Sequence, residues 1–242
     1  MKIIGLGHYS RTGKDSLAGY LVENFARNGL KAKKMSFAWK LKEICHDLYG
    51  WAGVRTPEHY DTPEGGKDRT VRLPLLATDK YPDGPTVVEL WIDFGTPAVR
   101  EQVYDMTWVN YVLKTDHDCD LLIVPDVRFF NEVKAIKDEG GLLIKVVRPG
   151  YSPRESVADL NLLHYRGWDA WVGGSGALRE LKEFADELSV AMVAGMGTSH
   201  ISGFTGPYQE LCSYAEQDHL SSCVAEEAID KWAVPSEVVN VS

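Results

Sequence analysis

The sequence has few cysteines, no block of basic residues and no long apolar run, and each absence excludes a class of protein. Its four cysteines form no C-x-x-C pair and no metal-ligand spacing with histidine. We therefore expect reduced thiols rather than a disulfide framework or a structural zinc site. The net charge is −9 and no Lys/Arg cluster is present, which argues against a nucleic-acid partner. No apolar stretch approaches the roughly 18 residues of a membrane span, so we expect no membrane partner and a cytoplasmic location.

The composition is that of an ordinary globular protein. Apolar residues make up 44% of the 242 residues and charged residues 25%, which is enough for a sizeable core. The length allows one α/β domain with an appendage. A small anionic ligand remains compatible with the acidic charge, because a few local cations and backbone amides can bind phosphate.

The first sixteen residues, MKIIGLGHYSRTGKDS, predict a phosphate-binding loop. A short apolar run at residues 3–6 indicates a buried strand, and a helical pattern begins at Lys14. In such a strand–loop–helix unit the loop amides and the helix dipole attract phosphate, and the lysine reaches the β/γ-phosphates. The usual spacing G-x-x-x-x-G-K-[ST] would place a glycine where His8 stands and a hydroxyl where Asp15 stands. A glycine-rich turn that only caps a helix is the alternative for this stretch alone.

Two later apolar strands each end in charged residues. Residues 121–124 predict a buried parallel strand that releases Asp126 and Arg128, and residues 142–147 predict a strand that ends at Arg148. Ligands of open α/β sheets bind at the carboxyl ends of the strands. An acid there can hold Mg²⁺ through water, and an arginine can neutralise a phosphoryl group. The alternative is a surface ion pair at a strand end.

Four further segments complete the sequence-based prediction. Residues 51–87 contain several prolines and glycines and carry Arg55, Lys67, Arg69 and Arg72; they are either a surface insertion or a mobile substrate-binding flap. A helix is expected to start at Thr96 as N-cap with a proline next, which would place Arg100 near its start. Residues 151–168 suggest a polar loop or short lid, and nothing in 193–242 suggests chemistry.

Four stretches together resemble the deoxynucleoside monophosphate kinases of tailed bacteriophages, a branch of the P-loop nucleoside monophosphate kinases. They are R-T-G-K-D-S at 11–16, D-F-G-T-P-A-V-R at 93–100 followed by M-T-W-V, I-V-P-D-V-R-F-F-N-E at 123–132, and K-V-V-R-P-G at 145–150. The resemblance covers roughly residues 1–190, and Asp15 after the lysine is typical of this family. Relatives commonly carry glycine at the position of His8, and segment 151–169 lacks their His-Ser/Thr-Glu cluster, of which His164 is a candidate remnant.

The resemblance implies a three-layer α/β/α P-loop kinase fold with a five-stranded parallel sheet of order 2-3-1-4-5. It implies a kinase domain over 1–192, with a nucleoside monophosphate-binding insertion at 51–87 and a lid-like segment at 151–169, followed by a C-terminal extension at 193–242. The expected reaction transfers the γ-phosphoryl of ATP, with Mg²⁺, to a deoxynucleoside 5′-monophosphate for phage DNA synthesis in the host cytoplasm. Nucleotides are the expected partners, and a homodimer is left open.

The resemblance also assigns roles to residues. Catalysis is expected of Lys14, Arg128 and Arg148. ATP binding is expected of Arg11, Thr12, Gly13, Lys14, Asp15 and Ser16. Substrate binding is expected of Arg100, Asp126, Arg69 and Arg72, and Mg²⁺ binding of Ser16, Asp15 and Asp126. Two alternatives remain: a P-loop kinase of another phosphorylated small molecule, and a nucleotide-dependent switch or assembly ATPase.

Overall fold

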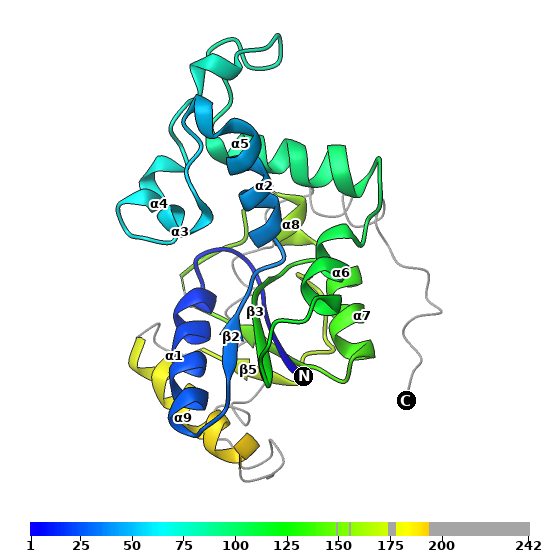
Figure 1. Cartoon of the computed structure of the whole chain (residues 1–242). Coiled ribbons are helices and arrows are strands. Elements are labelled where there is room, and N and C mark those ends of the chain that lie inside the picture. Colours follow the sequence, from blue (N-terminus) through cyan, green and yellow to red (C-terminus); the bar gives the residue numbers. More distant parts are fainter. Residues whose placement is uncertain (149, 155, 174–177, 194–242) are drawn as a thin grey trace. The chain divides into compact units, whose positions relative to one another are not determined.

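The computed structural model describes residues 1–148, 150–154, 156–173 and 178–193 (Figure 1). The chain forms two compact units. One joins Met1–Lys34 to the chain from His117 onward, and the other is Met35–Asp116. The expected extension at 193–242, with its histidines and cysteines, lies outside the described residues except for Val193. Every helix of the described part is too short or too polar to cross a membrane.

The first unit is built on a five-stranded parallel sheet. Its strands are β1 (Lys2–Gly7), β2 (Ala32–Lys34), β3 (Leu121–Val127), β4 (Leu142–Val146) and β5 (Ala170–Val172). Every pairing is parallel, and the order across the sheet is β2-β3-β1-β4-β5. The α/β class, the parallel sheet and the strand order expected of a P-loop kinase are thereby confirmed.

Helices cover both faces of this sheet. They are α1 (Lys14–Arg27), α7 (Phe130–Asp138) and α9 (Leu178–Val193), and the same unit also contains the short α8 (Val157–Leu160). Alternate strand residues such as Ile4 and Leu6 pack with α1 and α9, which lie side by side (Figure 1). On the other face, a Cβ added at Gly5 would lie 2.8 Å from Ile136 Cδ1 of α7. Because the strands are covered on both sides, they are continuous apolar runs rather than alternating ones.

The second unit is mainly helical. Its elements are α2 (Trp39–Tyr49), η1 (Gly50–Ala52), α3 (Pro57–Tyr60), α4 (Gly65–Asp68), η2 (Pro74–Leu76), α5 (Val87–Asp93), the π-helical η3 (Phe94–Arg100) and α6 (Thr107–Lys114). Tyr60 packs edge-on against Trp91 with ring centroids 4.9 Å apart, and Trp108 Nε1 donates to Gly95 O at 3.0 Å. Residues 51–87, expected to break any long element, thus contain short helical turns that are tied into an aromatic core.

The helix predicted to start at Thr96 starts ten residues earlier. Thr86 is the N-cap of α5: its hydroxyl accepts from Glu89 N at 3.2 Å, and Glu89 Oε2 accepts from Thr86 N at 2.7 Å. This capping box satisfies two backbone donors at once. Thr96 and Pro97 lie inside η3, where Glu101 N bonds to Thr96 O five residues back. The wider π turn accommodates a proline that would break an α-helix, and Arg100 ends the π segment rather than beginning a helix.

One strand boundary also differs from the sequence prediction. The strand expected at 121–124 continues through Val127, so Asp126 belongs to β3. The register of β3 against β1 shifts between Gly5 and Gly7 of β1, and this irregularity allows β3 to continue past Pro125. Arg128 is the first residue beyond the strand.

The position of the capping box gives a stability prediction. Thr86→Ala should lower the free energy of unfolding by about 1 kcal/mol, because it removes the acceptor for Glu89 N. Thr96→Ala is the matched control and should change the stability by less than about 0.5 kcal/mol. Urea unfolding of the two variants measures the difference. Equal losses would mean that Thr86 is not the start of the helix.

Candidate active site

The loop between β1 and α1, residues 8–13, has the backbone geometry of an anion-binding loop. Arg11 and Gly13 both have positive φ, 66° and 98°. Left-handed residues in a short loop turn successive N–H groups toward one side. Gly13 is the N-cap of α1, and no side chain caps the helix there. The first N–H groups of α1 therefore join the loop amides as donors for an anion.

The structure explains why this chain has glycine at position 7 and histidine at position 8, where the usual motif has its first glycine. A Cβ on Gly7 would lie 2.1 Å from Cη2 of Trp168, so Gly7 is required by the indole ring that packs on it. His8 has φ 102°, a left-handed conformation that glycine adopts without strain. Its side chain is buried, and its ring lies 3.8 Å from that of Tyr9. The backbone at position 8 thus has a conformation typical of glycine, although the residue is histidine.

Lys14, the first residue of α1, is a buried cation whose ammonium reaches back to the loop. Its ammonium donates to Tyr9 O and, at 3.2 Å, to Thr12 Oγ1. The pKa of Lys14 is lowered from 10.5 to about 8. Burial is the main cause, and the charge of the nearby Arg128 guanidinium is the second. Three carboxylates oppose this by acting to raise the pKa: Asp15, Asp159 and Asp126. Lys14, Asp126 and Arg128, which the sequence placed at one edge of the sheet, are therefore within electrostatic range of one another.

Arg128 is fixed at the carboxyl end of β3. Its backbone N–H and that of Phe129 both donate to Glu132 Oε2, at 2.7 and 3.0 Å, which anchors the turn into α7. The guanidinium Nη1 donates to Ser10 Oγ at 3.2 Å and to Asp159 Oδ1 at 2.6 Å. Arg128 therefore contacts the loop between β1 and α1, as its place at the strand end predicts.

Asp159 of α8 is a site residue that the sequence did not indicate. Its side chain is 1% exposed, and Oδ1 accepts from Ser10 N and Oγ at 3.2 and 3.1 Å in addition to Arg128. Oδ2 accepts from Arg154 N at 3.2 Å. The available signal was the pattern S-x-x-D at 156–159, in which the Ser156 hydroxyl accepts from Asp159 N. That pattern predicts a helix start but not the long-range contacts.

Arg148 lies near the same loop. Its Nη1 is 3.5 Å from Arg11 O, and its guanidinium stacks on the ring of Tyr151 at 4.3 Å. Stacking on an aromatic face orients a guanidinium without neutralising its charge. Both arginines that the sequence placed at strand ends thus lie close to the loop that precedes Lys14.

Asp15 and Ser16 begin α1. The Asp15 carboxylate is 83% exposed and lies 3.7 Å from Lys34 Nζ; Ser16 is half-buried. Among the described residues, no group of three or more His, Cys, Asp or Glu side chains is placed to hold a metal ion by itself. Mg²⁺ bound to a nucleotide takes only one or two protein ligands, because phosphates and waters supply the others. Asp15, Ser16 and Asp126 are compatible with that mode of binding.

The other expected substrate-binding residues belong to the second unit, and most have contacts within it. Arg69 donates to Tyr60 O and lies 3.5 Å from Asp61. Arg72 Nη1 donates to Gly84 O at 2.7 Å and lies 3.7 Å from Glu89. Arg100 ends η3 and is partly buried. Arg69 and Arg72 therefore stabilise the short helices and turns of residues 51–87 in addition to any role in binding.

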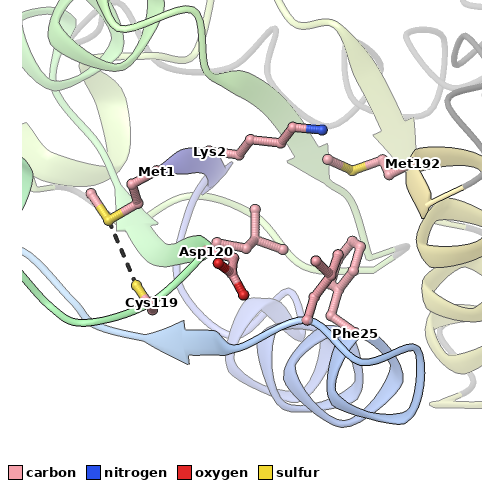
Figure 2. A pocket seen from close by; sticks show the side chains of 8 residues that line it. Met1, Lys2, Phe25, Cys119, Asp120 and Met192 are labelled. Atoms are coloured by element: carbon pink, nitrogen blue, oxygen red, sulfur yellow. Dashed lines mark hydrogen bonds between the residues drawn. The ribbon is translucent and has the colours of Figure 1, made fainter.

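A separate cavity lies at the opposite edge of the sheet (Figure 2). It has a volume of about 230 Å³ and is lined by Met1, Lys2, Phe25, Leu30, Cys119, Asp120, Leu121 and Met192. Cys119 Sγ donates to Met1 Sδ at 3.6 Å across one side. Lys2 and Leu121 begin β1 and β3, so this cavity is at the amino ends of the strands. Ligands of such sheets bind at the carboxyl ends, where the loop lies.

The sheet order, and the loop after β1 that is followed by a buried lysine at the start of α1, are consistent with a P-loop kinase fold. No family model matches the chain. A protein of Acanthamoeba polyphaga mimivirus, "Putative deoxynucleotide monophosphate kinase", is 31% identical over 180 residues, which are 70% of this chain and 86% of the relative. The chain belongs to the family of this relative, a family of nucleotide kinases.

The left-handed conformation of His8 predicts that glycine is more stabilising than alanine at this position. His8→Gly should be more stable than His8→Ala by about 1 kcal/mol, because only the alanine retains the strain of a Cβ at positive φ. Position 19 in α1, where a Cβ would meet nothing within 4 Å, is the control: Gly19→Ala should stabilise by about 1 kcal/mol. Chemical unfolding of the three variants measures both differences. An alanine that is as stable as glycine at position 8 would contradict the strained conformation.

The lowered pKa of Lys14 predicts a pH-dependent stability. Below about pH 8 the ammonium is charged in both the folded and the unfolded chain, so the fold bears the full penalty of burying it. Between about pH 8 and 10.5 the folded chain loses the proton first, and the penalty disappears. Relative to Lys14→Met, the parent should therefore gain up to about 3 kcal/mol of unfolding free energy over this range.

Urea unfolding of the parent and Lys14→Met at pH 7 to 11 tests this gain. Lys182→Met on α9 is the matched control, since it removes an exposed lysine instead of a buried one. A constant difference between parent and Lys14→Met across this range would contradict the burial of a charged Lys14.

Proposed function

We propose that the protein transfers the γ-phosphoryl group of ATP to the 5′-phosphate of a deoxynucleoside monophosphate, which yields ADP and the deoxynucleoside diphosphate. The observation that carries the proposal is the convergence of Lys14, Arg128 and Arg148 on the loop between β1 and α1. The name of the mimivirus relative supports this choice of acceptor. A role in phage DNA synthesis stays a prediction of the sequence.

The loop and Lys14 bind the ATP phosphates in this proposal. The backbone amides of Arg11, Thr12 and Gly13 and the first turn of α1 donate hydrogen bonds to the β- and γ-phosphates. The ammonium of Lys14, now bonded to Tyr9 O and Thr12 Oγ1, exchanges these acceptors for phosphate oxygens. A polyanion raises the pKa of Lys14, so binding favours its charged form.

Arg128 and Arg148 stabilise the negative charge of the migrating phosphoryl group in this proposal. Phosphoryl transfer needs little covalent chemistry from the protein, and most of the catalysis comes from positioning and charge stabilisation. Arg128, 28% exposed and held by Asp159, and Arg148, stacked on Tyr151, are both restrained before substrates bind. We assign them to the transition-state charge. The acceptor needs no general base, because its phosphate is already ionised near neutral pH.

Mg²⁺ has a compatible set of protein groups. Ser16 supplies a hydroxyl, and Asp15 and Asp126 supply carboxylates close enough to Lys14 to affect its pKa. We propose that they hold the ion directly or through water. When bound, Mg²⁺ neutralises charge on the phosphates. Mutation of these residues should raise the Mg²⁺ concentration needed for turnover.

Three arginines of the second unit are proposed to bind the acceptor: Arg100 its phosphate, with Arg69 and Arg72 as further cations. Asp126 of β3, in the first unit, is assigned separately as a substrate-binding acid. A kinase of another phosphorylated small molecule would use the same residues around the loop. A switch or assembly ATPase would hydrolyse ATP without an acceptor, and strand-end arginines beside the loop are less expected there.

A coupled assay of ADP release against dAMP, dGMP, dCMP, dTMP and their ribose counterparts tests the proposal. Release should depend on a deoxynucleoside monophosphate and should fall by at least 10³-fold in Lys14→Ala, because the variant lacks the ammonium that is proposed to follow the migrating group. Lys182→Ala is the matched control and should retain the parent's turnover. ADP release without any acceptor would favour the ATPase, and near-normal turnover of Lys14→Ala would rule out the assignment of the loop.

A further inference from the structure

A carboxylate that no sequence motif indicated joins three separate segments of the first unit. Asp159 comes from α8, Ser10 from the loop after β1, and Arg128 from the end of β3. Its partners lie 149 and 31 residues away in the sequence. A buried carboxylate is retained only where donors compensate for the loss of water. The contacts around Asp159 therefore indicate a role in fixing these segments.

We propose that Asp159 is a positioning residue for phosphoryl transfer, and that it holds the guanidinium of Arg128 beside the phosphate-binding loop. The proposal rests on the proposed function and adds a residue to it. Arg128 is the group that meets the migrating phosphoryl, and Asp159 acts through Arg128. An arginine carries several rotatable bonds, so a carboxylate that fixes it before substrate binds removes an entropic loss from the reaction.

The geometry leaves Arg128 able to act while it is held. Asp159 Oδ1 and Ser10 Oγ are the partners of Nη1, and the other guanidinium N–H groups of Arg128 bond to none of the described residues. The side chain of Arg128 is 28% exposed whereas that of Asp159 is 1% exposed. One edge of the guanidinium is thus anchored in the protein interior, and the side chain retains an exposed part for a phosphate oxygen.

The same contacts argue against an opposite role, in which Asp159 blocks the loop as a substitute for phosphate. A carboxylate in the phosphate position would bond to the amides at the start of α1. The described hydrogen bonds of the Asp159 carboxylate go instead to Ser10, Arg128 and the backbone of Arg154. Ser10 precedes the left-handed Arg11 and Gly13, so the carboxylate supports one side of the loop and leaves the helix start open.

A double-mutant cycle on the full-length protein tests this role. Asp159→Asn should lower kcat roughly 100-fold, the order expected when a catalytic group moves by about 1 Å, while KM for ATP changes less than about threefold. Arg128→Ala should lower kcat at least as much. The double variant should be no slower than Arg128→Ala within about twofold, because Asp159 has nothing to position once Arg128 is absent.

Asp169→Asn is the matched control. Its carboxylate also accepts a backbone N–H, from Leu143 at 2.7 Å, and pairs with Lys137, but it precedes β5 at the amino edge of the sheet. It should affect thermal unfolding without lowering kcat in the folded protein. If Asp159→Asn does not fold, Asp159→Glu keeps the charge, displaces the guanidinium by one methylene and should still lower kcat at least tenfold.

The outcomes of these experiments distinguish failure of the positioning role of Asp159 from failure of the proposed function. An active parent in which the effects of Asp159→Asn and Arg128→Ala multiply overturns the positioning role alone. Tighter ATP binding or faster turnover in Asp159→Asn also overturns it and supports a blocking carboxylate. A parent that transfers no phosphoryl group to any nucleoside monophosphate overturns the proposed function, and the positioning role fails with it.

Discussion

The burial of a lysine ammonium next to a guanidinium is the constraint on which the site depends. Desolvation and the Arg128 charge together lower the pKa of Lys14 to about 8, so the folded chain holds two cations where each disfavours the other. Carboxylates on three elements compensate: Asp15 of α1, Asp126 of β3 and Asp159 of α8. Such an arrangement is unfavourable for stability by itself. A bound polyanion would favour the charged form of Lys14, and a nucleotide kinase binds such polyanions.

Strained backbone conformations in the loop are a second unfavourable contribution to the stability of the fold. His8 and Arg11 both have positive φ without being glycine, and such residues persist only where the surroundings fix them. Here the indole of Trp168 packs on Gly7, and Asp159 accepts the Ser10 N–H. Trp168, which precedes β5, and Asp159 of α8 thus support the loop from outside.

Sequence reasoning succeeded where a short-range pattern determines the structure. Continuous apolar runs identified the buried strands, and Gly13-Lys14 identified the start of α1, because strand burial and helix initiation are local. It failed at Thr96, where a threonine followed by proline competed with the T-x-x-E pattern at Thr86, and only tertiary packing distinguishes the two. It missed Asp159 because a helix of four residues has no apolar period, and its partners are distant in sequence. The site residues themselves remain proposals that the geometry supports.

A net charge of −9 is compatible with a polyanionic substrate only if the cations are local. The fold achieves this through the parallel sheet: because every strand runs in the same direction, the residues that follow β1, β3 and β4 emerge at one edge. Lys14, Arg128 and Arg148 follow those three strands. The negative net charge disfavours non-specific binding of polyanions such as nucleic acid. The common direction of the strands therefore determines where Lys14, Arg128 and Arg148 gather.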